Sequence, residues 1–270
     1  MALTPHSFGL SDVGRVRKKN EDSYFIDDVL GLYVVADGMG GHAGGEVASA
    51  EAIDQIFAMI RKGLPQIAAF QRNPSDDNRG AVRRMVEAAI QAATYMVFGI
   101  AEQDPSRKGM GTTISCLIFT GPHALVGQVG DSRVYLVRQD VPVQITEDHT
   151  LVNMQLKAGA ITAEQAKTVP YQNLITRAVG VKDYVEVDVF DMECAPGDRF
   201  VLCSDGVHGY LKDEVELGRL AGRGSREEAA RALVSFALQK GGRDNATALV
   251  VDIQGQGQQQ GTFDVDIDNL

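Results

Sequence analysis

Residues 32–49 read LYVVADGMGGHAGGEVAS, and their character changes from apolar to acidic to glycine-rich and then to helix-forming. The apolar run over residues 32–36 predicts a short buried strand. Asp37 and Gly38 follow it directly, and a segment with helical spacing begins after the glycines. A carboxylate therefore stands where a buried strand ends.

The glycine pattern of this stretch allows a second interpretation. Residues 38–43 match G-x-G-x-x-A between a strand and a helix, which is the fingerprint of a dinucleotide-binding turn. The charge of Asp37 would then lie beside the pyrophosphate, and no regular alternation of strands and helices follows. We therefore favour an interpretation that uses the carboxylate, and dinucleotide binding is the alternative.

Further aspartates occupy the same kind of position. Acids stand at strand ends or in adjoining loops at Asp22, Asp37, Asp131, Asp205 and Asp244. A single Asp-Gly pair is most simply a turn, but several converging carboxylates repel one another and are costly to bury without a cation. Magnesium and manganese prefer oxygen ligands of this kind. The sequence thus predicts a site for a hard divalent cation.

Other apolar runs predict a strand-rich protein. They cover residues 113–119, 124–129, 134–137, 185–190, 200–203 and 248–253. Helical spacing over residues 47–60 and 82–96 predicts a pair of helices, joined by turn-forming residues at 63–80. Ser225 stands three residues before Glu228, which predicts a capping box at the start of a late helix.

The connections between the middle strands predict the fold class. GDSR at residues 130–133 and RQDVP at residues 138–142 are short turns, so antiparallel hairpins are expected rather than crossover units. This indicates an α+β protein whose sheets are covered by helices. One domain is expected over residues 1–253, and residues 254–270 are too polar to offset their ordering entropy, which predicts a flexible Gln/Gly-rich acidic tail.

Composition argues against several classes of function. The chain has 270 residues, 44% of them hydrophobic, which is enough for a single buried core. A net charge of −10 opposes a nucleic-acid partner. The three cysteines have no CxxC spacing, so neither a disulfide framework nor a zinc site is expected. Without a long apolar run or a signal-peptide pattern, we expect a cytoplasmic protein with no membrane partner.

A series of motifs extends these observations across about residues 8–253. In order they are SDVG, Arg17 with NED, DGMGGHAGGEVAS, GMGTT, GDSRVY, TEDHT, CSDG and GRDNATALVV. Together they resemble the metal-dependent protein phosphatases, the type 2C serine/threonine class, in its bacterial branch. The resemblance implies two packed antiparallel sheets flanked by helices, an α-β-β-α sandwich with a flap insertion near the active site.

The resemblance also implies a binuclear manganese or magnesium centre. Asp37 would bridge two tightly bound ions, Asp205 and Asp244 would complete one, and the Gly38 carbonyl would serve the other. Asp22 would hold metal-bound water from outside the immediate ligand shell. A bridging water would then be the nucleophile.

A looser third ion is implied as well. Its ligands would be Asp131 and Asp205, but Gly209 stands where animal members have a further aspartate, so this ion is expected to bind weakly. Gly209 is four residues after Asp205.

Two side chains are implied to act on the substrate. Arg17 would grip the phosphate through its guanidinium fork, although an ordinary surface arginine is the alternative. His42 could protonate the leaving alkoxide, but Met39 replaces the histidine that animal members carry after Asp-Gly, which leaves the general acid open. His149 is equally compatible with a structural role, and Cys203 is expected in the core.

The function that follows is a phosphatase acting on phosphoserine and phosphothreonine, opposing a bacterial-type serine/threonine kinase. Its partners would be phosphorylated proteins and that kinase, and we expect a monomer. A catalytically weak pseudophosphatase that binds phosphoproteins is the alternative. Residues 148–180 would form the flap, either selecting substrates or serving as a plain surface excursion.

Overall fold

The computed structural model describes residues 2–40 and 44–255. His42 and most of the predicted tail, residues 256–270, lie outside the described residues. The last described strand ends at Gly255. No helix in the described part of the chain has the length and apolar character needed to cross a membrane.

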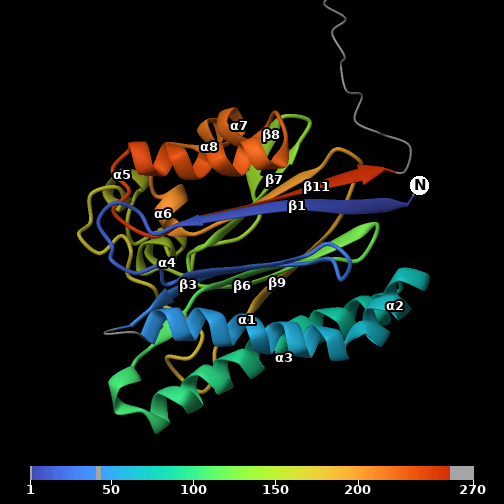
Figure 1. Cartoon of the computed structure of the whole chain (residues 1–270), viewed down its shortest axis with the longest axis horizontal. Helices are drawn as coiled ribbons and strands as arrows, with labels where there is room; N and C mark the ends of the chain where they lie inside the picture. Colours follow the sequence, from blue (N-terminus) through green and yellow to red (C-terminus); the bar gives the residue numbers. More distant parts are fainter. Residues whose placement is uncertain (1, 41–43, 256–270) are drawn as a thin grey trace, which may run out of the picture.

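Two antiparallel sheets are stacked face to face (Figure 1). The five-stranded sheet has the order β1 (Leu3–Asp12), β11 (Ala246–Gly255), β10 (Arg199–Cys203), β7 (Arg133–Arg138) and β8 (Val141–Gln144). The six-stranded sheet has the order β2 (Asp22–Asp27), β3 (Leu32–Met39), β5 (Ile114–Phe119), β6 (His123–Val129) and β9 (Asp188–Glu193), with the short β4 (Gly111–Thr112) paired to β3.

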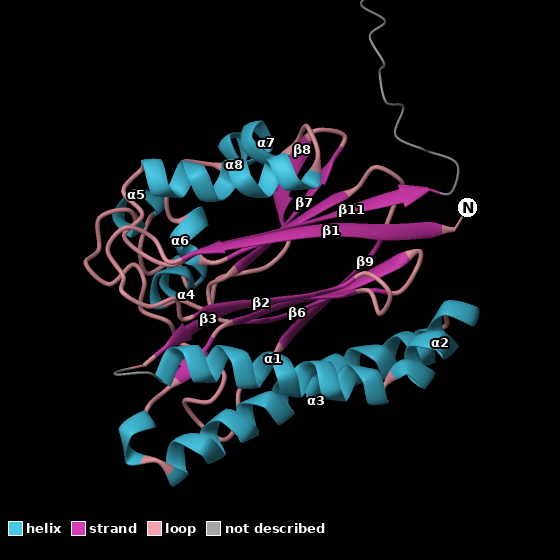
Figure 2. Cartoon of the chain, in the orientation of Figure 1, coloured by secondary structure: helices cyan, strands magenta, loops and turns pink. Residues whose placement is uncertain are grey.

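Helices cover the outer face of each sheet, as Figure 2 shows. The six-stranded sheet is covered by α1 (Gly44–Lys62), α2 (Leu64–Arg72) and α3 (Asp76–Gln103). The five-stranded sheet is covered by α7 (Glu214–Ala221) and α8 (Arg226–Gln239). Short helices lie between these elements: η1 (Pro105–Arg107), α4 (Leu151–Lys157), α5 (Ala163–Ala166) and α6 (Asp205–His208). The predicted α-β-β-α sandwich is confirmed.

The first five residues of β3, residues 32–36, are apolar at every position rather than at alternate ones. Leu32 and Val34 pack against the helical layer, whereas Tyr33 and Val35 pack between the two sheets. Successive side chains of a strand point to opposite faces, so a strand covered on both faces is apolar throughout. All four residues have no exposed surface.

The prediction of a plain turn over residues 63–80 is wrong. This segment contains α2 and the beginning of α3. Pro65 lies in the first turn of α2, where its missing N–H costs nothing, and Ile67 and Phe70 are buried. Ser75 then caps α3 through the backbone N–H of Asn78. The polar and proline-containing residues of this segment therefore lie at the beginnings of α2 and α3.

The prediction of a hairpin at GDSR is also wrong. Strand β6 belongs to the six-stranded sheet and β7 to the five-stranded sheet, so residues 130–133 carry the chain from one sheet to the other. The RQDVP turn does form a hairpin, between β7 and β8. Gln139 and Asp140 have φ values of 52° and 62°, as the two central residues of a type I′ turn require.

Candidate active site

Two of the predicted aspartates face each other across one strand pair. Asp22 is the first residue of β2, and its partner in the ladder is Asp37, near the end of β3. Directly opposite residues on antiparallel strands have their Cβ atoms about 5 Å apart, and like charges there are destabilising. The register of β2 on β3 therefore places two carboxylates of like charge next to each other.

The fold brings the remaining predicted aspartates to the same place. Burial raises the pKa of Asp37 well above its usual range, and the neighbouring charges that raise it further are Asp22, Asp205, Asp131 and Asp244. Asp131 follows β6, Asp205 follows β10 in the first turn of α6, and Asp244 precedes β11. Ends of strands from both sheets thus form one cluster of five carboxylates, called here the aspartate cluster.

Burial and mutual repulsion affect the other members of the aspartate cluster as well. Burial raises the pKa of Asp22 to about 6, although hydrogen bonds from Thr247 and Ser204 oppose the increase. The pKa of Asp131 rises to about 7 through burial and the charge of Asp205, and that of Asp205 is raised by burial and by Asp244. Such carboxylates favour either a proton or a cation beside them.

The chemistry of the aspartate cluster fits a hard divalent cation. Oδ1 of Asp22 and Oδ1 of Asp205 are buried and have no hydrogen-bond partner among the described residues. No group of three or more His, Cys, Asp or Glu side chains within residues 2–40 and 44–255 is arranged to hold a metal ion as it stands. Magnesium sites, however, commonly use only one or two carboxylates and complete the shell with water. The carboxylate oxygens of the aspartate cluster are therefore enough to bind such an ion together with water.

Gly38, directly after Asp37, is closely packed by two backbone carbonyls. A Cβ atom there would be 2.1 Å from the carbonyl oxygen of Gly45 and 2.5 Å from that of Glu21. The backbone N–H of Gly38 donates to the same Glu21 carbonyl at 3.1 Å. The end of β3 can pack between α1 and the residue before β2 only because residue 38 has no side chain.

Arg17 lies at the exposed edge of the aspartate cluster. Its Nη2 is 2.8 Å from Oδ2 of Asp244, and the two side chains are 48% and 35% exposed. The cation is therefore next to the predicted metal ligands and open to solvent on its outer side. Of the residues predicted to act on substrate or metal, the structure brings together all but His42, which it does not describe.

Two threonines of the GMGTT motif hold the backbone of Asp37, a role that the sequence reasoning missed. The Asp37 N–H donates to Thr113 Oγ1 at 3.0 Å. The Asp37 carbonyl accepts from the Thr113 N–H at 2.8 Å and from Thr112 Oγ1 at 2.9 Å. The position of the motif just before a predicted strand was the available signal, but only the pairing of β3 with β4 and β5 reveals the contact.

The loop that carries Asp131 is held by two histidines. His208 Nε2 donates to the Asp131 carbonyl at 2.9 Å, and burial lowers the pKa of His208 to about 3, so the ring is neutral. His149 Nδ1 accepts from the Gly130 N–H at 3.1 Å, and its Nε2 is 3.0 Å from Asp188 Oδ2. Both rings are engaged with neighbouring structure, and the sequence reasoning had not singled out His208.

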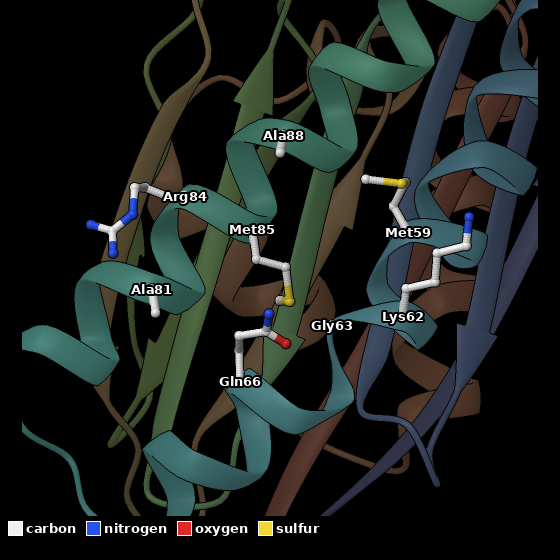
Figure 3. A pocket seen from close by; sticks show the side chains of 8 residues that line it. All are labelled: Met59, Lys62, Gly63, Gln66, Ala81, Arg84, Met85 and Ala88. Carbon is white, nitrogen blue, oxygen red and sulfur yellow. The ribbon is translucent and has the colours of Figure 1, made fainter.

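A cavity of about 440 Å³ lies away from the aspartate cluster, between α1, α2 and α3 (Figure 3). Its lining consists of small and apolar residues with Gln66 and two cations, Lys62 and Arg84. No carboxylate lines this cavity, so it offers no ligand for a divalent cation. The aspartate cluster, which gathers buried carboxylates at strand ends of both sheets, is therefore the candidate active site.

The family model described as Protein phosphatase 2C matches residues 15–239. The chain belongs to the protein phosphatase 2C family. Its residue range includes every aspartate of the cluster except Asp244, which lies five residues further on.

Curated relatives of this 2C family member are bacterial serine/threonine phosphatases. PstP of Mycobacterium tuberculosis is 38% identical over 243 residues, or 90% of this chain. The phosphatase stp of Listeria innocua is 33% identical over 250 residues, or 92% of this chain. The chain spans only 44% of the length of PstP, but the aligned region is 95% of the Listeria protein.

Solved structures show the same 2C architecture. The crystal structure of M. tuberculosis PstP has a TM-score of 0.81 and 34% identity, covering 94% of this chain and 100% of that one. The catalytic domain of PstP in complex with two manganese ions has a TM-score of 0.79 at 34% identity, with the same coverage.

Proposed function

We propose that this chain is a metal-dependent protein phosphatase that removes phosphate from phosphoserine and phosphothreonine. The observation that carries the proposal is the aspartate cluster, in which two buried carboxylate oxygens have no partner among the described residues. The relatives named as serine/threonine phosphatases, and the two manganese ions bound by PstP, support the same activity.

Three members of the aspartate cluster, together with Gly38, have a proposed part in holding two manganese or magnesium ions, and Asp22 would lie just outside their ligand shell. Asp37 would contact both ions, Asp205 and Asp244 would complete one site, and the Gly38 carbonyl the other. When bound, the ions would supply an acidified water and neutralise charge on the phosphate oxygens. No side chain of the protein needs to be phosphorylated in this scheme.

Arg17 would bind the substrate phosphate. Its guanidinium forms an ion pair with Asp244 at the edge of the cluster, and about half of its side chain is exposed to solvent. A phosphate dianion arriving from that side could accept two parallel N–H donors from the guanidinium. The ion pair with Asp244 would keep the guanidinium close to the cluster while no substrate is present.

A third ion, the general acid and the partners have further proposed assignments. Asp131 and Asp205 would hold a third, weaker ion. His42 would protonate the leaving alkoxide, since a histidine titrates near neutral pH. Phosphorylated proteins would be the substrates, and a serine/threonine kinase the opposing enzyme.

Hydrolysis of a phosphothreonine peptide tests this function. We expect turnover with added manganese, none after treatment with a chelator, and none in a folded Asp37→Asn variant. The pseudophosphatase alternative predicts that the peptide binds but is not hydrolysed at any manganese concentration. Equal rates with and without chelator would refute the metal-dependent mechanism.

The kinase partner needs a separate measurement. Comparison of protein phosphorylation in cells with and without this chain should show an increase at serine and threonine sites when the chain is absent. Phosphorylation that does not change at any such site would contradict a role in opposing a kinase.

A further inference from the structure

Asp22 belongs to one sheet, but the groups that bind its side chain come from the other. Its strand, β2, is in the six-stranded sheet. Thr247 on β11 donates from Oγ1 to Oδ2 of Asp22 at 2.6 Å, and Ser204, directly after β10, donates from Oγ to the same oxygen at 2.8 Å. Thr247 and Ser204 have no exposed surface, and Asp22 is 8% exposed.

The direction of each hydrogen bond follows from the carboxylate. An ionised carboxylate only accepts, so the single hydroxyl proton of Thr247 must point to Asp22. The Thr247 oxygen is 2.7 Å from Ser11 Oγ, its neighbour in the β1–β11 ladder, and Ser11 must therefore be the donor in that pair. Asn20 Nδ2 donates in turn to Ser11 Oγ at 2.8 Å.

The orientation of the Asn20 amide agrees with this order. Its Oδ1 accepts the backbone N–H of Asp22 at 3.2 Å, which leaves Nδ2 as the group that faces Ser11. Asn20, Ser11 and Thr247 thus form a one-directional chain of donors that ends on the carboxylate of Asp22.

Ser204 is fixed independently by the backbone of β11. The Thr247 N–H donates to Ser204 Oγ at 3.1 Å, and the Ser204 N–H donates to the Thr247 carbonyl at 3.1 Å. With its acceptor position occupied by a backbone N–H, the hydroxyl of Ser204 has its proton free for Asp22. Each hydroxyl that donates to Oδ2 is therefore itself held by another donor, Ser11 for Thr247 and the Thr247 N–H for Ser204.

The two oxygens of Asp22 consequently differ. Oδ2 receives two hydroxyl donors, whereas Oδ1 is buried without a partner among the described residues, beside the facing Asp37. We propose that Thr247 and Ser204 are positioning residues that hold Oδ2 and so present Oδ1 of Asp22 to the cation site. This inference rests on the proposed function, because it assigns Oδ1 to that site.

Manganese affinity of Thr247 variants, measured by titration calorimetry, tests the inference. Thr247→Val keeps the shape of the side chain but removes the donor, and we expect manganese to bind about 10- to 100-fold more weakly, as for other hydrogen-bond partners around a metal site. Thr247→Ser keeps the hydroxyl and should bind manganese close to the wild-type affinity. The proposal would be overturned if Thr247→Val bound manganese with wild-type affinity, or if Thr247→Ser bound it as weakly as Thr247→Val.

Thr94→Val is the matched control. Thr94 is also fully buried and donates its hydroxyl to the Ile90 carbonyl at 2.9 Å, but it lies on α3 in the helical layer. The control should bind manganese like the wild type even if it loses stability. An equal loss of manganese affinity in Thr94→Val would overturn a specific role of Thr247. If Thr247→Val does not fold, Ser204→Ala decides the question in the same titration.

The same titrations separate this proposal from the proposed function. A wild-type protein that hydrolyses no phosphopeptide, but loses manganese affinity in Thr247→Val, would retain the positioning role and refute the phosphatase activity. An active wild-type enzyme whose manganese affinity is the same in Thr247→Val would refute the positioning role alone.

Discussion

Arg17 is held at the aspartate cluster by one ion pair, with Asp244, and half of its side chain is exposed. This position suits a group that binds substrate, because nothing in the described structure covers its outer side. Arg17→Ala should raise KM and lower kcat/KM on a phosphothreonine peptide, since the guanidinium would contact the phosphate in both the ground and transition states. Arg17→Lys should recover only part of the loss, because lysine cannot form the planar fork.

Lys18→Ala is the control for this prediction. Lys18 is exposed and adjacent to Arg17, so the substitution removes the same charge from nearly the same place. It should leave kcat/KM close to that of the wild type. Equal effects of Arg17→Ala and Lys18→Ala would show that only the local charge matters.

Asp131 carries the prediction of a third ion. Asp131→Ala should lower kcat and remove a weak phase of manganese binding while leaving the tight phase, because Asp131 is not among the proposed ligands of the central pair. Titration calorimetry separates the two phases. Asp54→Ala, which removes an exposed acid from α1, is the control. Loss of the tight phase in Asp131→Ala would contradict the assignment.

Gly209, the position where a ligand of the predicted third site is missing, is a poor place for adding one. A Cβ atom there would lie 2.7 Å from the carbonyl oxygen of Asp205. A substitution would therefore move the backbone of a candidate metal ligand. This contact gives a local reason for glycine where animal members of the family carry an aspartate.

The start of α8 is an element whose stability depends on a few neighbouring residues. Ser225 Oγ accepts the N–H of Glu228, and the Glu228 side chain accepts the N–H of Ser225, as predicted from the sequence. Ser225→Ala should lower the free energy of unfolding by about 1 kcal/mol, measured in urea, because the backbone N–H of Glu228 loses its acceptor. Manganese affinity and kcat should not change, and a change in either would contradict an effect confined to the helix.

Elements that depend on nearby residues were the ones predictable from sequence. The capping box, the strand at residues 32–36 and the RQDVP hairpin all follow from side chains within a few positions of one another. The strand predicted at residues 185–190 instead lies at Asp188–Glu193, and β1 was not predicted. Every described residue of β1 is at least partly exposed, so it lacks the apolar run of a buried strand.

Burial of the aspartate cluster, together with repulsion among its members, should make the stability of the whole molecule depend on pH. Burial raises the pKa of Asp131 to about 7 and that of Asp37 well above the usual range. The folded protein then binds more protons than the unfolded chain, so the free energy of unfolding should fall as pH rises from about 6.5 to about 8. Measuring above pH 6.5 largely avoids the opposing effect of the buried, neutral histidines.

Melting temperatures in chelator across this pH range test the effect. We expect the melting temperature to decrease with pH, Asp131→Asn to reduce the decrease, and manganese to raise stability at about pH 8 because it binds the folded state. A melting temperature in chelator that increases over this range would contradict the raised pKa values of the buried carboxylates.

The sequence alone determined the chemical type of the site. Aspartates at successive strand ends, with glycine beside Asp37 and Asp205, indicated oxygen ligands for a hard cation, and the ordered motifs indicated the family. These signals are local because each one requires only an acid next to the end of an apolar run. The same locality explains the failure at GDSR, since a turn of four residues does not reveal whether the following strand stays in the same sheet.

Tertiary structure alone decided how the aspartates are held. Asp22 and Thr247 are 225 positions apart, and they meet because β2 and β11 belong to different sheets that pack face to face. Tyr33 and Val35 on one sheet and Leu249 and Val251 on the other fill the space between them. The free energy of burying that apolar layer sets how closely the sheets approach, and no short stretch of sequence contains that information.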